Sequence, residues 1–170
     1  MRKLLIAVCV IAAVLLDYLI LPGLGLARIA PDVLIALFVS VSVLTGLLPA
    51  VPLSIAVGLI LDIGFNRFIG MSALPLFASS LAGALFYSRF YADNIVIPAV
   101  TAAAAAFVKE LFLFAALMIS GGRTSGYFAL FALRMLPVSL LTGAVCAALH
   151  LLLKKHLLRS SFRHDIDYLR

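Results

Sequence analysis

Six ionisable residues stand inside or at the edge of long apolar stretches of this 170-residue chain. A charge at the centre of a membrane-spanning helix costs about 2.5–3.5 kcal/mol on insertion scales, so each of these side chains needs a partner, water or a cavity. Their chemistry is that of ion pairs or of a polar binding groove. The six are Asp17, Asp32, Asp62, Lys109, Glu110 and Arg134.

Asp62 is the most informative of the six because it belongs to a stripe with a period of four. Ser54, Gly58, Asp62 and Asn66 fall on one slowly drifting face of a helix. The small and polar face of a membrane helix packs against protein or lines a cavity, and the aliphatic face meets lipid. The sequence therefore predicts that Asp62 faces other helices, and that lipid meets Ile55, Leu59 and Ile63.

The arrangements that support catalysis or ligand chemistry are not evident in the sequence. None of His150, His156 and His164 is paired with a cysteine or serine at a telling spacing. There is no glycine-rich phosphate loop and no metal-ligand spacing. We expect no catalytic residue, no cofactor and no metal, and we interpret His150 as an interfacial side chain near the end of the last apolar run.

The composition is that of an integral membrane protein. The chain is 65% hydrophobic and 12% charged, whereas soluble domains are about 45–50% apolar and about 25% charged. The net charge of +6 gathers near the chain ends, which is typical of topology signals and not of nucleic-acid binding. We expect a basic cytoplasmic tail over residues 154–170 to contact anionic lipid or cytoplasmic partners through Lys154, Lys155, Arg159 and Arg163.

Apolar runs separated by breaker clusters predict a six-helix transmembrane domain over residues 1–153. Backbone groups in lipid are satisfied only in helices or closed barrels, and these runs are too long for barrel strands. The second and third runs are short and meet at a proline pair, so they form either two tilted spans, which their lengths favour, or one re-entrant hairpin. The runs are Leu4–Leu21, Val33–Leu48, Pro49–Phe65, Met71–Tyr87, Ile95–Ile119 and Tyr127–Leu153.

The distribution of lysine and arginine predicts that both termini are cytoplasmic. On that topology the six ionisable residues lie in the outer half of the membrane. Two interpretations stay open. In one, the charges pair with each other to fix the bundle, Asp62 with Arg134, and Lys109 with Asp17 or Asp32. In the other, they line an outward-facing groove that accepts a partner.

A short motif adds a family resemblance. Gly58-Leu59-Ile60-Leu61-Asp62, followed by Gly70-Met71-Ser72-Ala73-Leu74, resembles the MreD family of rod shape-determining proteins, where a Gly-Leu-x-x-Asp run ends one span and a Gly-x-x-Ala-Leu motif opens the next. Pro31-Asp32 matches a Pro-Asp pair that commonly starts an earlier span. The specific motif is confined to Pro31–Leu74, and the rest of the chain matches in length, hydropathy and basic tail.

The resemblance implies an all-α, six-helix inner-membrane component of the bacterial elongation machinery that is not an enzyme. Its expected partners are an MreC-like single-span protein and, indirectly, MreB, RodA and a class B penicillin-binding protein. The family's fold is similar to that of the substrate-binding subunits of energy-coupling-factor transporters. The expected partner groove comprises Asp17, Pro31, Asp32, Ser54, Gly58, Asp62, Asn66, Gly70, Lys109, Glu110 and Arg134.

The same residues allow two other hypotheses about function. One is a small-molecule carrier subunit of the vitamin-transporter type, which the outer-half charges favour but the scarcity of amide and aromatic residues disfavours. The other is an intramembrane enzyme or proton-coupled transporter, which rests only on Asp62, Lys109 and Glu110.

Overall fold

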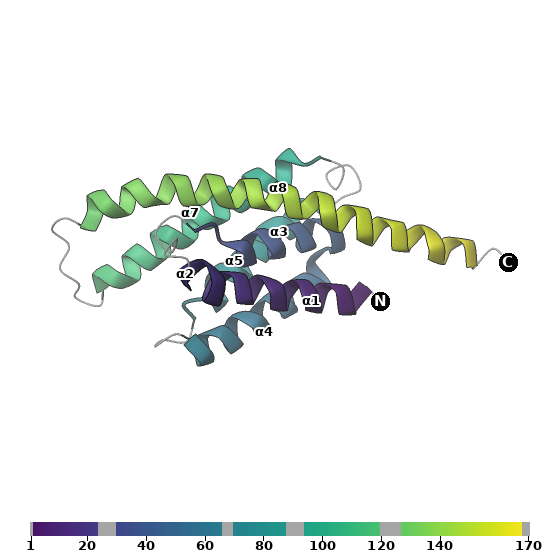
Figure 1. Cartoon of the computed structure of the whole chain (residues 1–170), viewed down its shortest axis with the longest axis horizontal. Coiled ribbons are helices and arrows are strands. Elements are labelled where there is room, and N and C mark those ends of the chain that lie inside the picture. The colour runs from purple at the N-terminus through teal and green to yellow at the C-terminus, as the bar shows by residue number, and fades with distance from the viewer. Residues whose placement is uncertain (1, 24–29, 66–69, 88–93, 120–126, 168–170) are drawn as a thin grey trace.

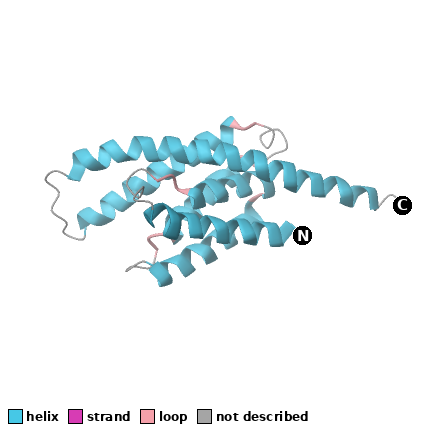
Figure 2. Ribbon diagram, viewed as in Figure 1, coloured by secondary structure: helices cyan, strands magenta, loops and turns pink. Residues whose placement is uncertain are grey.

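Helices form at each of the six apolar runs in the computed structural model of the chain. The structure describes the backbone of residues 2–23, 30–65, 70–87, 94–119 and 127–167, and the side chains of residues 6–23, 30–65, 70–87, 94–119 and 133–155. Within these residues the fold is all-helical, with no strand (Figure 2). Asn66 and the side chains of Arg159 and Arg163 lie outside the described residues.

The first rod is continuous through α1 (Arg2–Leu15), a π-helical turn η1 (Leu16–Ile20) and α2 (Leu21–Gly23). Four segments are long and apolar enough to cross a membrane, as in a multi-pass membrane protein. They lie in the first rod, in α4, in α7 and in α8. The remaining bounds are α3 (Val33–Thr45), α4 (Leu47–Phe65), α5 (Ala73–Leu85), α7 (Val96–Ile119) and α8 (Tyr127–Asp167).

Helices α3 and α5 are shorter than the sequence suggested. Each has 13 residues, about 20 Å at 1.5 Å per residue, whereas the hydrocarbon core of a bilayer is about 30 Å thick. The run expected to continue to Leu48 is broken at Gly46, after which α4 begins. The start of α3 directly after Pro31-Asp32 follows the expectation.

Helix α3 is the centre of the bundle. Every residue from Val33 to Val43 is buried, and α3 contacts α1, α4, α5, α7 and α8. Its sequence is apolar around the whole circumference, which is the pattern of a helix enclosed by protein on all sides. Because other helices shield it from lipid, α3 does not need the length of a spanning helix.

The two ends of the chain lie at the same end of the bundle (Figure 1). Helix α1 begins there, and α8 passes it and extends beyond the other helices. The predicted tail at residues 154–170 starts within α8, which continues unbroken to Asp167. The N-terminal ends of α3, α5 and α8 all point to the opposite end of the bundle.

Small residues bring α7 and α8 together. A Cβ atom added to Gly143 would lie 2.9 Å from the carbonyl oxygen of Ala99, so the two backbones touch at that point. The interpretation of His150 as interfacial is wrong. His150 has no exposed surface, and its Nδ1 lies 3.1 Å from the hydroxyl oxygen of Ser40 on α3.

Candidate functional site

Asp62 organises the start of α5. Its side chain is buried, and its carboxylate accepts hydrogen bonds from the backbone N–H groups of Gly70 (2.6 Å), Ser72 (2.7 Å) and Ala73 (3.2 Å). The first N–H groups of a helix have no partner within the helix, and leaving them bare in a membrane is costly. A carboxylate at a helix N-terminus is also favoured by the helix dipole. Asp62 therefore faces inward, as predicted, and its observed role is that of an acceptor for the next helix.

The two halves of the sequence motif contact each other. A Cβ atom added to Gly58 would lie 2.4 Å from Cα of Ala73, so only glycine allows α4 to approach the first residue of α5 this closely. Gly70 adopts a φ of 105°, a conformation that favours glycine, and so directs its N–H toward Asp62. We call Gly58, Asp62, Gly70, Ser72 and Ala73 the α4–α5 junction.

Two carboxylates accept hydrogen bonds from backbone N–H groups at the start of α3, as Asp62 does for α5. Asp17, in η1, accepts hydrogen bonds from the N–H groups of Val33 (3.1 Å) and Leu34 (2.8 Å). Asp32 is the N-cap residue and accepts from the N–H of Ile35 (3.1 Å). The acids at positions 17, 32 and 62 thus share one function, which is to satisfy the N-termini of the two short helices inside the bundle.

Two cations, one on α7 and one on α8, lie beside acidic side chains. Lys109 forms an ion pair with Asp32, which is one of the pairings expected from the sequence. Arg134 lies beside Glu110, with 3.8 Å between the guanidinium Nη2 and the carboxylate Oε1. The expected pairing of Asp62 with Arg134 is wrong, because Asp62 is turned toward α5 and Arg134 toward α7.

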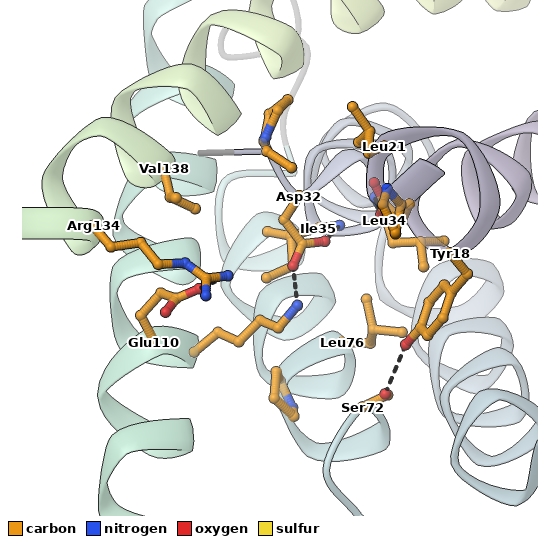
Figure 3. A pocket seen from close by; sticks show the side chains of 16 residues that line it. Tyr18, Leu21, Asp32, Leu34, Ile35, Ser72, Leu76, Glu110, Arg134 and Val138 are labelled. Carbon is orange, nitrogen blue, oxygen red and sulfur yellow. Dashed lines mark hydrogen bonds and ion pairs between the residues drawn. The ribbon is translucent and has the colours of Figure 1, made fainter. Parts of the chain in front are cut away.

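A polar cavity of about 210 Å³ lies at the N-terminal ends of α3 and α5. The side chains of both ion pairs and of Asp17 line it. Arg134 and Glu110 stand on one side, Asp32 in the middle, and Tyr18 and Ser72 on the other side (Figure 3). The Tyr18 hydroxyl lies 3.1 Å from the Ser72 hydroxyl. The cavity therefore offers carboxylates, cations and hydroxyls in one small space, at the end of the bundle opposite to the start of α1.

The structure divides those residues of the predicted groove that it describes into two groups. Those that line the polar cavity are Asp17, Pro31, Asp32, Lys109, Glu110 and Arg134. The others pack α4 against α5. Ser54 lies 3.0 Å from the hydroxyl of Ser80, and Gly58, Asp62 and Gly70 belong to the α4–α5 junction. The cavity also contains Tyr18 and Ser72, which sequence reasoning missed. Ser72 lies within the motif, and that was the available signal.

A second, larger hollow lies between α5 and α7. This α5–α7 groove has a volume of about 730 Å³ and is mostly apolar. It is lined by small side chains and by exposed apolar residues such as Val100, Val108 and Leu74. Pro75 and Lys109 line both the groove and the polar cavity, so the two hollows adjoin. The small residues are Ala78, Ser79, Ala82, Thr101, Ala104 and Ala105.

The remaining chemistry of the described residues is sparse. Among the described residues, no three histidine, cysteine, aspartate or glutamate side chains are grouped as a metal site requires. Lys154 and Lys155 lie on α8, with Lys155 exposed. Comparison with known proteins found no matching family model, curated protein or solved structure.

Proposed function

We propose that this chain is a scaffold of the bacterial cell-elongation (rod) complex in the inner membrane, and that it binds the membrane helix of an MreC-like single-span partner. It would not be an enzyme; it would help to control cell shape and lateral peptidoglycan synthesis by holding that partner near MreB, RodA and a class B penicillin-binding protein. The α5–α7 groove is the main observation in support of this proposal, and the motif resemblance is the second.

The α5–α7 groove suits a helix in lipid. Membrane helices associate through close packing at small residues, because lipid tails are as apolar as their side chains. Alanine residues from both α5 and α7 line the groove. Exposed valines of α7 also line it, and they would contact the side chains of an inserted helix. The Ser54–Gly58–Asp62 face does not serve as this surface, because α5 already covers it.

The proposed topology has six helices in the membrane, with both termini cytoplasmic and the polar cavity in the outer half. The arrangement would be like that of energy-coupling-factor substrate-binding subunits. Lysine and arginine near the chain ends support this orientation. Lys154, Lys155 and the basic residues after them would contact anionic lipid on the cytoplasmic side.

A small-molecule carrier has less support. Sites for small ligands usually have volumes of about 300–1,000 Å³, and the polar cavity of about 210 Å³ is smaller. The larger groove is lined almost entirely by apolar side chains, which gives few groups to orient a vitamin. These two observations favour the scaffold over the carrier.

Site-specific photo-crosslinking tests the proposal. A photoreactive phenylalanine is placed at Ala104, which lines the groove, in cells that also express the tagged MreC-like protein of the same genome. The matched control is Leu140, an exposed residue of α8 that does not line the groove. We expect a crosslink to the tagged partner from position 104 and none from position 140.

A second arm fills the groove. Ala104→Phe should abolish recovery of the tagged partner, and Leu140→Phe should leave recovery unchanged. Crosslinks from position 104 to phospholipid alone, or equal partner recovery with both phenylalanine variants, would contradict the docking of a partner helix in this groove.

A further inference from the structure

Glu110 is a buried carboxylate that lacks a hydrogen bond from any described residue. Only 5% of the residue is exposed, and it lines the polar cavity. Its closest cation, Arg134, is 3.8 Å away, which is beyond hydrogen-bond distance, and the Arg134 side chain is 43% exposed. Buried ionised carboxylates require paired, hydrogen-bonded neighbours. Glu110 therefore has capacity for a donor that enters the cavity.

The charges of the cavity lining do not balance. Three carboxylates, Asp17, Asp32 and Glu110, face two cations, Lys109 and Arg134. Asp32 is matched by Lys109 and Glu110 loosely by Arg134, so Asp17 is the acid of the lining that forms no ion pair with a described residue. The N-terminus of α3 offsets about half a charge. The lining thus favours an additional positive group.

The size of the cavity limits what that group can be. A volume of about 210 Å³ is roughly that of seven water molecules at about 30 Å³ each. It is too small for a helix, and it is large enough for one long side chain. Because Pro75 and Lys109 line both the cavity and the α5–α7 groove, a helix lying in the groove would lie beside the cavity.

We propose that the polar cavity is a receptor for one lysine or arginine side chain of the partner, located where the partner's membrane helix leaves the outer half of the bilayer. The cationic head would donate hydrogen bonds to Glu110 and lie near Asp17. Such a contact fixes the height and rotation of the partner helix, which an apolar groove alone does not specify. This inference rests on the proposed function and adds the chemistry of recognition to it.

The test uses the crosslink from position 104 as its readout. Glu110→Gln and Asp17→Asn each remove one negative charge and keep the size of the side chain, and each keeps one of the two acceptor oxygens. In the partner, the basic residues at the outer end of the membrane helix are replaced one at a time by glutamine. We expect one partner substitution, and Glu110→Gln, to weaken association about ten- to a hundredfold, as for loss of a charged hydrogen bond.

Two further arms separate a folding defect and a free ligand from the proposed contact. The partner substitutions leave this chain intact, so a loss of crosslink there is not caused by misfolding. A charge swap, Glu110→Lys with glutamate at the partner position, should restore the crosslink. Free n-butylguanidinium at millimolar concentration should compete with the partner for the wild-type chain and have no effect on the Glu110→Gln variant.

The outcomes are distinct. An unchanged crosslink from position 104 with every charge variant and every partner variant would overturn the inference and leave groove docking in place. No crosslink with the unmodified pair would overturn the proposed function itself. Stabilisation of this chain by n-butylguanidinium together with full tolerance of the partner substitutions would overturn the partner's side chain as the source of the cation.

Discussion

Gly58 on α4 lies directly against Ala73, the first residue of α5, so closely that a Cβ atom at position 58 would be 2.4 Å from Ala73 Cα. Asp62, one helical turn further along α4, accepts the N–H groups that begin α5. One contact thus explains the Gly-x-x-x-Asp spacing. The long helix α4 packs against the start of the short helix α5 and supplies acceptors for its first N–H groups. This relationship stands within the chain and needs no ligand.

Replacement of Gly58 by alanine should separate α4 from α5. The obstacle is backbone, which cannot rotate away, so we expect a loss of about 1–3 kcal/mol in the free energy of unfolding, as for overpacking. Gly64 on the same helix is the control, since a Cβ atom there meets nothing within 4 Å. Thermal unfolding of purified protein in detergent provides the measurement. Equal stability of Gly58→Ala and Gly64→Ala would contradict the close contact.

Replacement of Asp62 by leucine should leave the N–H groups at the start of α5 without acceptors. We expect a cost of about 1–3 kcal/mol for an unsatisfied buried group, and an intermediate cost for Asp62→Asn, which keeps one acceptor oxygen. Hydrogen–deuterium exchange reports the effect locally. The amides of residues 70–76 should exchange faster in Asp62→Leu, while those of α8 keep their protection. Unaltered exchange in 70–76 would refute the capping role.

The pair of Asp32 and Lys109 should show strong coupling. Lys109→Met alone leaves a buried carboxylate uncompensated, which typically costs about 3–5 kcal/mol. Asp32→Asn keeps the N-cap acceptor for Ile35 and removes only the charge. The double variant should therefore be more stable than the sum of the two single losses implies. Denaturation by increasing SDS in mixed micelles measures all four corners of this cycle, and additive losses would exclude a functional pair.

The buried contact of His150 with Ser40 should also contribute to stability. His150→Leu conserves bulk and removes the ring nitrogen 3.1 Å from the Ser40 hydroxyl, so we expect a loss of about 1–3 kcal/mol. Leu152→Ala, at an exposed position of the same helix, should have a smaller effect in the same unfolding assay. If both variants unfold at the same temperature as the wild type, the contact between His150 and Ser40 does not contribute to stability.

Periodicity was a reliable guide to which face of a helix is buried. The spacing of Ser54, Gly58 and Asp62 predicted an inward face, and Ile63, about 100° around the helix from Asp62, is 77% exposed. This works because a helix fixes the angle between residues four apart. The Pro31-Asp32 pair likewise predicted the start of α3, because an N-cap is a local signal.

The partners of the charged residues were harder to predict. Residue order gives depth along a span, but it does not give the rotation of one helix about its axis relative to another. Asp62 and Arg134 were expected to pair on depth alone, and they face different neighbours. The acceptor role of Asp62 was also hidden, because its donors are backbone N–H groups of residues 70–73, which leave no trace in side-chain composition.

Helix length and the α5–α7 groove depended on tertiary structure. An apolar run shows that a segment avoids water, but it does not show whether lipid or protein surrounds it, so the shielding of α3 was not visible in advance. The groove requires knowledge of which helices are adjacent. Only the fold shows that Thr101, Ala104 and Ala105 line the groove.

The central position of α3 has a consequence for biosynthesis. Asp32 is translated 77 residues before Lys109, so the growing chain inserts an acid into the membrane long before its counter-ion exists. Nascent bundles that end before α7 hold Asp17 and Asp32 at the entrance of α3 without an ammonium group. We therefore expect products truncated before α7 to be less stable in the membrane than the full chain, because their acids have no counter-ion.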